Sequence, residues 1–251
     1  MHILLTNDDG IRAQGIKALY AALVAANHQV DVVAPMRQQS GVGQCLTVFE
    51  PVRVKTYTEG AYTGTGLYGT PADCVKLALG ELLKTPPDLV VSGINLGANV
   101  GPDVLYSGTI AAAIEGMLAK FPSIAVSLDD HNARDLTKQA AHFTRLLAQI
   151  DWAKVPEKRV LNVNYPKGDF ATQKGLRICS QSKATWLNSY TARLDPRGAT
   201  YYWLDGDIAQ NELEENCDLV LLREGYITLT PLYFDFNDQE GLDILKSMDL
   251  S

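Results

Sequence analysis

No apolar run in this chain approaches the ~20 residues that a membrane span needs, and its first residues lack the layout of a cleavable signal. The chain of 251 residues has only four cysteines, and no two of them form a CxxC pair. This spacing fits neither a zinc site nor a disulfide framework, so we interpret them as buried free thiols of a cytoplasmic protein. The four histidines show no ligand spacing either.

Positive charge is also scarce. Lysine and arginine number 22 against 29 aspartate and glutamate residues, which gives a formal net charge of −7. A broad basic face for a nucleic-acid polymer is therefore not expected. An anionic substrate would have to be held by a metal, by backbone N–H groups or by a few side chains. Neither a GxxxxGK[ST] phosphate loop nor a GxSxG nucleophile elbow occurs.

One segment matches the dinucleotide-binding motif GxGxxG but lacks its expected structural context. The segment from Gly64 to Gly69 reads GTGLYG and matches GxGxxG. A dinucleotide fingerprint should follow the first strand directly and open a helix. Here the motif follows the irregular TEGAYT and precedes Thr70-Pro71, so we do not favour a dehydrogenase that uses it. Absence of nicotinamide binding would exclude that alternative.

The first 165 residues alternate short apolar strands with amphipathic helices. Apolar side chains recur at helical spacing between the strands, as at Ile16, Leu19 and Leu23. This alternation predicts an α/β fold, with a mostly parallel sheet and helices on both faces. The expected strands are HILLT, QVDVVAP, PDLVVSG, SIAVSL and RVLNVNYP, with further β structure in TVFEPVRVKTY.

The pattern changes after Tyr165. Residues 184–205 are polar and aromatic, and we interpret them as an arm, either a subunit contact or a hairpin folded back on its own domain. Residues 238–250 predict a short C-terminal helix. We expect one domain over residues 1–251, with its core at about 1–180 plus 218–235 and the arm and the helix as a C-terminal extension.

Two adjacent carboxylates end the first strand, in Asn7-Asp8-Asp9-Gly10. Like charges at ~4 Å repel by several kcal/mol in a partly shielded site. A divalent cation would cancel that repulsion, and hard cations favour carboxylate, amide and hydroxyl oxygens. Loops after neighbouring strands of the same sheet edge add Ser40 and Asn95. The alternative is that Asp9 only caps the following helix.

A second polar feature starts another helix. Ser107, Gly108 and Thr109 precede an apolar stripe, and helix N-termini bind phosphate through free N–H groups. The preceding loop from Gly93 to Gly101 is rich in glycine and carries Asn95 and Asn99, whose surroundings let backbone N–H groups approach an anion. Ordinary capping by Ser107 is the structural alternative. A metal beside such an anion site indicates phosphoester chemistry.

These segments together resemble a known family. The segments ILLTNDDGIRAQGI, APMRQQSGVG, YGTPADCV, VVSGINLGANVG and YSGTIAAAIEG are similar, in order, to the signature segments of the SurE (survival protein E) 5′-nucleotidases. They cover most of the first 120 residues, and the later GYITLTPL resembles a tail segment of that family. The segment PLYFDFND departs from it, since a threonine near Asn237 is more usual there.

The resemblance implies a Rossmann-like core and one divalent cation per subunit, magnesium or manganese. It implies hydrolysis of nucleoside 5′-monophosphates, with 3′-nucleotides and short polyphosphate as further substrates in some members. It also implies homodimers or homotetramers that exchange C-terminal segments, which favours a subunit contact for the arm. By position, the implied metal ligands are Asp8, Asp9, Ser40 and Asn95. The implied phosphate-binding residues are Asn95, Asn99, Ser107, Gly108 and Thr109.

The mechanism that fits these residues is direct hydrolysis. Asp8 or Asp9 accepts a proton from the attacking water, and groups near Ser107 and Thr109 stabilise the developing charge. An aspartyl-phosphate on Asp8 is the second possibility. The alternative from another class is a protein that binds metal and nucleotide or polyphosphate without hydrolysis.

Overall fold

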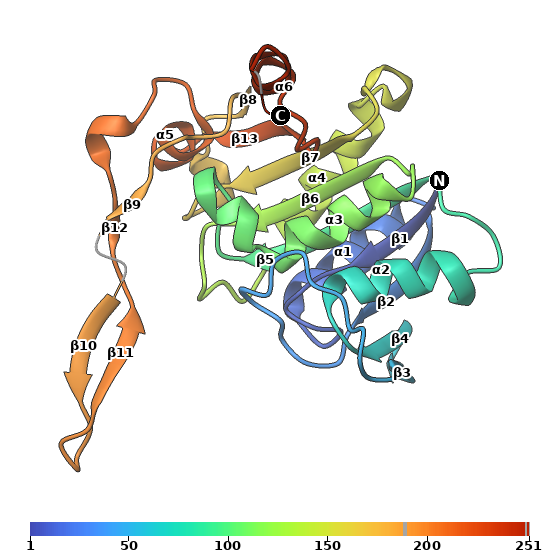
Figure 1. Cartoon of the computed structure of the whole chain (residues 1–251). Coiled ribbons are helices and arrows are strands. Elements are labelled where there is room, and N and C mark those ends of the chain that lie inside the picture. The colour runs from blue at the N-terminus through green and yellow to red at the C-terminus, as the bar shows by residue number, and fades with distance from the viewer. Residues whose placement is uncertain (188–189, 249, 251) are drawn as a thin grey trace.

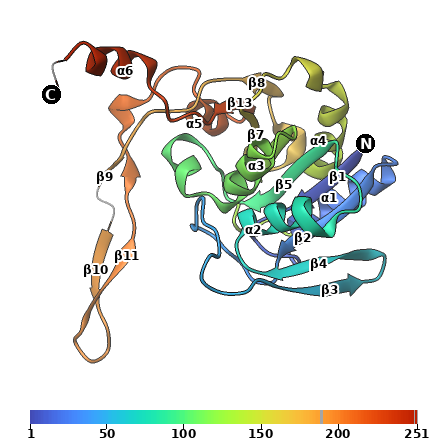
Figure 2. The same ribbon diagram turned by 45° about the vertical axis from the view of Figure 1, so that its right-hand side comes forward.

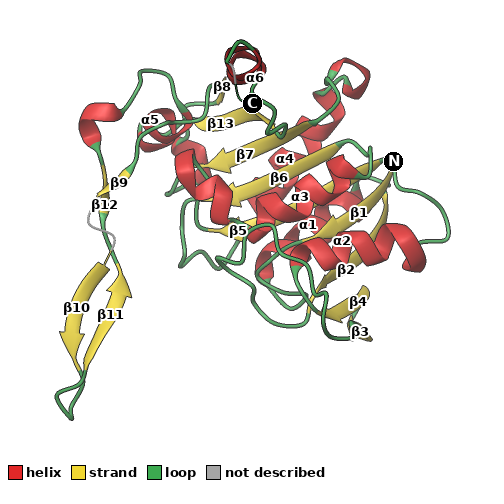
Figure 3. Ribbon diagram, viewed as in Figure 1, coloured by secondary structure: helices red, strands yellow, loops and turns green. Residues whose placement is uncertain are grey.

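A nine-stranded sheet forms the centre of the computed structural model, which describes residues 1–187, 190–248 and 250 (Figures 1 and 3). Its strands are β1 (His2–Thr6), β2 (Gln29–Pro35), β3 (Arg53–Glu59), β4 (Tyr62–Tyr68), β5 (Leu89–Leu96), β6 (Ser123–Leu128), β7 (Arg159–Tyr165), β8 (Leu176–Ile178) and β13 (Ile227–Tyr233). Their order across the sheet is β3-β4-β2-β1-β5-β6-β7-β13-β8. The strands from β4 to β7 in this order are parallel, whereas β3 and β13 run antiparallel to β4 and β7.

Four helices cover the two faces of the sheet (Figure 2). They are α1 (Gln14–Ala25), α2 (Pro71–Leu77), α3 (Gly108–Leu118) and α4 (Thr137–Gln149). Helices α1 and α4 pack together on one face, and α2 and α3 on the other. Among the described residues, no helix combines the length and the apolar composition needed to cross a bilayer. The predicted α/β architecture, with a mostly parallel sheet between helices, is confirmed.

The first strand shows why the apolar runs of the sequence predicted this fold. Consecutive side chains of a strand point to opposite faces. Ile3 and Leu5 therefore lie in the core cluster under α1 and α4, and Leu4 lies in the cluster under α2 and α3. All three are fully buried. A strand covered on both faces reads as an unbroken apolar run, and each such leucine contributes about 1.5–3 kcal/mol of burial.

The region around the GTGLYG segment differs in part from the sequence expectation. Gly64 and Gly66 lie inside β4, away from any turn that opens a helix, so this part of the structure does not form a dinucleotide fingerprint. The β structure expected from Thr47 begins only at Arg53. The Thr47 N–H instead donates to the Asp73 carboxylate, at 3.0 Å, and so does not join a ladder.

The C-terminal part forms two small antiparallel sheets and two helices. They are β9 (Trp186–Leu187) with β12 (Asp207–Ile208), β10 (Tyr190–Leu194) with β11 (Thr200–Leu204), and the helices α5 (Asp218–Arg223) and α6 (Gln239–Lys246). Both views show the β10–β11 hairpin projecting from the main body (Figures 1 and 2). Positions 188–189 of the expected arm and position 249 of the expected helix lie outside the described residues. Helix α6 is shorter than the 238–250 expected.

A buried carboxylate closes the base of this arm. Asp218 begins α5, and its two oxygens accept from the N–H groups of Gly101, at 3.0 Å, and Ser182, at 2.8 Å. Burial raises the pKa of Asp218, and these hydrogen bonds oppose that rise. Trp186 adds a bond from its indole to Asp103, at 2.8 Å. The two ends of the arm are thus fixed beside the loop that follows β5.

Candidate active site

The carboxylate pair lies in a turn that its own neighbours fold. Asn7 Nδ2 donates to the Gly10 carbonyl, at 3.0 Å, and the Gly10 N–H donates back to Asn7 Oδ1, at 3.2 Å. Gly10 has φ +99° and lies against the Pro35 carbonyl, so a side chain there would be strained. These two hydrogen bonds turn the chain out of β1 at Asp8. Such a turn is required if the side chains of Asp8 and Asp9 are to point to the same site. Sequence reasoning missed the role of Asn7.

Asp8 is buried against the start of α3. Its Oδ1 accepts a hydrogen bond from the Thr109 hydroxyl, and its backbone carbonyl accepts from the Gln39 N–H, at 2.8 Å. A Cβ on Gly108 would lie 2.8 Å from Asp8 Cβ, so the glycine allows this close approach. Burial raises the pKa of Asp8 to about 6, the Thr109 bond opposes the rise, and the charge of Asp9 adds to it.

Asp9 faces the loop after β5. Its Oδ2 accepts from the Leu96 N–H, at 3.2 Å, and Gln38 Nε2 lies 3.5 Å from its Oδ1. Burial raises the pKa of Asp9, whereas the Leu96 bond and the positive charge of protonated His131 lower it. The two carboxylates are therefore held by different elements, Asp8 by α3 and Asp9 by the β5 loop.

The structure brings the two expected neutral ligands to the same place. Asn95 donates from Nδ2 to the Gly97 carbonyl, at 2.7 Å, which leaves Oδ1 as its free ligand atom within the described part of the chain. Ser40 is exposed, and its Oγ accepts from Gln38 Nε2, at 2.9 Å. The Gln38 amide thus lies between Ser40 and Asp9, a contact that no sequence motif signalled.

These residues suit a hard divalent cation. In the ranges 1–187, 190–248 and 250, neither Asp8 nor Asp9 pairs with a lysine or arginine. No three His, Cys, Asp or Glu side chains gather as a metal cluster in those ranges, so the remaining donors are the amide and hydroxyl oxygens. An all-oxygen set with two unneutralised carboxylates fits magnesium or manganese.

The start of α3 is capped by its own serine. Ser107 Oγ accepts from the Ile110 N–H, at 3.1 Å, as the capping alternative expected. Its hydroxyl proton is still available to a ligand, because the cap uses only the oxygen as acceptor. The Thr109 hydroxyl donates to Asp8 and so fixes the carboxylate in place. Ser107 and Gly108 remain as donors for an anion.

Asn99 is bonded to the strands of the sheet. It is buried, and its Nδ2 donates to Ser127 Oγ, at 2.8 Å. Its backbone is held by Asn162 and Asn164 of β7, whose Nδ2 atoms donate to the Asn99 carbonyl at 2.7 and 3.1 Å. Asn99 therefore anchors the loop to the sheet. The two asparagines within the RVLNVNYP strand belong to this network.

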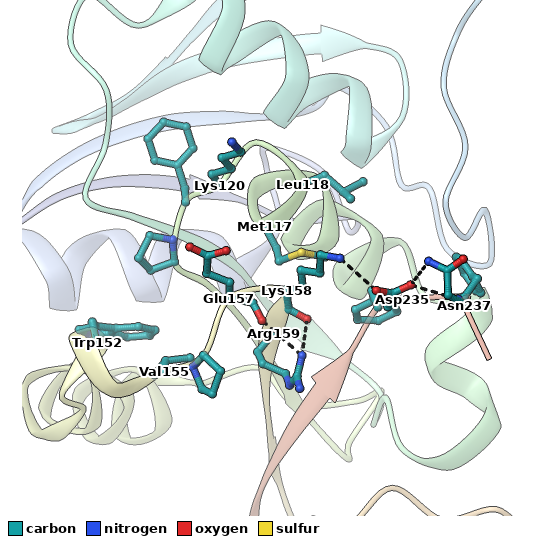
Figure 4. A pocket seen from close by; sticks show the side chains of 15 residues that line it. Met117, Leu118, Lys120, Trp152, Val155, Glu157, Lys158, Arg159, Asp235 and Asn237 are labelled. Atoms are coloured by element: carbon teal, nitrogen blue, oxygen red, sulfur yellow. Dashed lines mark hydrogen bonds and ion pairs between the residues drawn. The ribbon is translucent and has the colours of Figure 1, made fainter. Parts of the chain in front are cut away.

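A cavity of 570 Å³ lies at another part of the molecule (Figure 4). It is lined by the end of α3, the segment before β7 and residues 234–237. Parallel strands β6 and β7 begin at this edge, whereas ligands of such sheets bind beyond the carboxyl ends of the strands. Lys158 in this cavity is paired with Asp235, at 3.0 Å. The carboxylate pair, and not this cavity, is therefore the candidate active site.

Comparisons with known proteins point to one family. A family model described as "Survival protein SurE" matches residues 3–188. A protein named 5′-nucleotidase SurE from Desulfovibrio desulfuricans is 57% identical over 255 residues, covering 100% of this chain and 99% of its own. One of the same name from Nitratidesulfovibrio vulgaris is 50% identical over 249 residues, covering 99% and 100%. The crystal structure of the SurE protein from Aquifex aeolicus matches with a TM-score of 0.83 and 34% identity, covering 98% of this chain and 100% of that one.

Proposed function

Because the chain belongs to the survival protein SurE family, we propose that it is a 5′-nucleotidase, a phosphomonoesterase that converts nucleoside 5′-monophosphates to nucleoside and phosphate. Its full-length relatives carry the name 5′-nucleotidase. The observation that supports the proposal is an adjacent carboxylate pair that no described lysine or arginine neutralises, with Asp8 buried against the N-terminus of α3 and Asp9 partly buried beside the loop after β5. This arrangement suits a cation and a phosphoryl group side by side.

The ligands of one divalent cation, magnesium or manganese, are Asp8, Asp9, Ser40 and Asn95 in this proposal. When bound, such a cation supplies Lewis-acid stabilisation of a phosphoryl oxygen. The turn of Asn7 to Gly10 and the Leu96 N–H hold the two carboxylates before any ligand arrives. Little reorganisation is then needed on binding, which favours affinity.

Asp8 and Asp9 are also the candidate bases. A carboxylate within hydrogen-bond reach of the attacking water can accept its proton. Asp8 and Asp9 are the two carboxylates at the site, held by the Thr109 hydroxyl and the Leu96 N–H. The developing charge on the phosphoryl group is stabilised by Ser107 and the N-terminus of α3, with Gly108 giving close approach. Asn95, Asn99 and Thr109 complete the phosphate-binding residues of this proposal, and Asn99 also anchors the loop after β5.

Two other outcomes are kept open. Asp8 could act as nucleophile and form an aspartyl-phosphate, with water attacking in a second step. The chain could also bind metal and nucleotide or polyphosphate without turnover. Trapping of phosphate on the protein would support the first of these. Binding of Mn²⁺ and AMP by folded protein without phosphate release would support the second.

The test is release of inorganic phosphate from AMP, GMP and 3′-AMP with Mn²⁺, with Mg²⁺ and with EDTA. The variants are Asp9→Asn and the matched control Asp169→Asn, an exposed aspartate paired with Lys138 on the surface. We expect metal-dependent release from AMP and GMP, lost in Asp9→Asn and kept in the control. Release that survives both EDTA and Asp9→Asn would show that the carboxylate pair is not the active site.

Finer features of the family are part of the same proposal. Activity on 3′-nucleotides and short polyphosphate is tested with the same assay. We propose a homodimer or homotetramer in which the β10–β11 hairpin contacts a second copy, because aromatic side chains such as Tyr202 and Trp203 are exposed on it. We also propose a cytoplasmic location, which fits free thiols such as Cys74 and Cys217.

A further inference from the structure

A histidine lies beside the carboxylate pair without belonging to its ligand set. His131 follows β6, three residues after Leu128, which ends the strand. Its imidazole packs on Gly97: an added Cβ there would lie 3.0 Å from His131 Nδ1 and closer still to Cε1. The carbonyl of Gly97 accepts from Asn95 Nδ2, and the N–H of Leu96, one residue earlier, holds Asp9. The ring therefore rests on the short loop that carries both groups.

The nitrogens of this ring are free to act on a ligand. Within residues 1–187, 190–248 and 250, no hydrogen bond or ion pair engages His131, and its side chain is exposed. The ring lies on Gly97, one residue from the Leu96 N–H that bonds to Asp9, and is therefore beside the carboxylate pair. By contrast, His2 and His142 each bond to a neighbouring side chain, Asp31 and Tyr165.

The proposed reaction requires a group of this kind. A nucleoside that leaves a phosphoryl group departs through its 5′-oxygen, and an alkoxide is too strong a base to leave readily without a proton. The other groups at the site are carboxylates, an amide, hydroxyls and backbone N–H groups, and the carboxylates are needed as ligands or base. An imidazolium is the side chain that most often supplies a proton near neutral pH.

We propose that His131 is the general acid that protonates the 5′-oxygen of the leaving nucleoside, an inference that rests on the proposed nucleotidase function. A water oxygen forms a bond to phosphorus, and its proton passes to Asp8 or Asp9. The bond between phosphorus and the 5′-oxygen breaks, and that oxygen takes the proton of the His131 ring. Nucleoside and phosphate result, and the exposed imidazole regains a proton from solvent, as the carboxylate loses one to it.

The experiment compares two substrates that differ in one atom. The 5′-oxygen of AMP would leave as an alkoxide unless it receives a proton, whereas the analogue with sulfur in place of that oxygen leaves as a thiolate, which needs no proton. The variants are His131→Asn, His131→Arg and the control His28→Asn, a histidine near the N-terminal amine. Arginine keeps the positive charge but does not give up its proton. Mn²⁺ binding by calorimetry is measured for every variant.

We expect His131→Asn to lower kcat for AMP by about 10²- to 10⁴-fold, the usual contribution of a general acid. The same variant should leave kcat for the sulfur analogue within a few-fold of wild type and Mn²⁺ affinity unchanged. His131→Arg should behave like His131→Asn, and His28→Asn like wild type.

Three results would overturn the assignment. Equal losses on both substrates would show a role other than proton donation. Recovery of AMP turnover by arginine would show that positive charge alone is used. Loss of Mn²⁺ affinity in His131→Asn would place the ring among the groups that hold the cation. A wild-type protein without metal-dependent release from AMP would instead refute the nucleotidase function itself, and the general acid with it.

Discussion

Replacing Asp8 with asparagine should stabilise the metal-free protein while it abolishes metal binding. The buried carboxylate is costly to ionise when no cation is present, because desolvation and the charge of Asp9 both disfavour its charged form. Asparagine has nearly the same shape and keeps an oxygen that can accept from the Thr109 hydroxyl. The substitution therefore removes the charge and preserves the contact.

The magnitude follows from the pKa of Asp8, which rises from an ordinary 3.8 to about 6 in the folded protein. As pH increases, the unfolded state loses its proton first, so the free energy of unfolding falls between pH 3.8 and about 6. At about 1.4 kcal/mol per pH unit, the loss is about 3 kcal/mol at neutral pH. Below pH 3.8 both states are protonated, and the stabilising contribution of the raised pKa is fully present.

Thermal unfolding in EDTA tests this directly. At pH 7.5, Asp8→Asn should melt about 6–12 °C above wild type, given about 2–4 °C per kcal/mol for a chain of this size. At pH 4 the difference should shrink towards zero. Added Mn²⁺ should raise the melting temperature of wild type only. An Asp8→Asn variant that melts no higher than wild type at pH 7.5, or whose gain is the same at both pH values, would refute the reasoning.

Three further predictions concern neighbouring groups. Thr109→Val removes the donor to Asp8, so Mn²⁺ affinity at neutral pH should fall about ten- to a hundred-fold by titration calorimetry, and unchanged affinity would contradict this. Gly97→Ala places a methyl group against the His131 imidazole, so kcat for AMP should fall well below that of the control Gly168→Ala. Gly168 has a similar positive φ but open surroundings. Equal rates in the two variants would show that the loop accommodates the methyl group without cost. Trp203→Ser in the arm should shift sedimentation towards smaller species with an unchanged circular dichroism spectrum, and an unaltered distribution would exclude that side chain from subunit contact.

Much of the fold could be predicted from the sequence because its strands are buried on both faces. Leu4 and Leu5 face different core clusters, so the strand shows no alternation and reads as an apolar run. Such a run followed by polar residues places a loop at the ligand-binding edge. The prediction of β structure was right from Arg53 and wrong for residues 47–52, because β propensity carries no information about which partner takes each N–H.

The site was only partly predictable. The adjacent carboxylates Asp8 and Asp9 and the helix start at Ser107 can be recognised in the sequence, and Asp8 contacts that helix start in the structure. The orientation of Asn99 was not predictable, because its partners Ser127 and Asn164 come from strands that only the folded sheet brings near. The histidine on Gly97 was missed for the same reason. The spacing of the histidines along the sequence does not show which of them lies near the carboxylate pair in the folded chain.

The base of the arm has a consequence for how such chains diverge. Asp218 holds the start of the arm at Ser182 and its own end of the arm beside Gly101, and the β10–β11 hairpin projects from the main body (Figure 1). The entropy of closing a loop grows by only about 0.6 kcal/mol for each doubling of its length. The stability of a single chain therefore constrains the length of the arm only weakly. A peptide tag inserted at the Asp195–Gly198 tip, or a changed hairpin that forms a different assembly, should therefore leave the central sheet and its site unchanged.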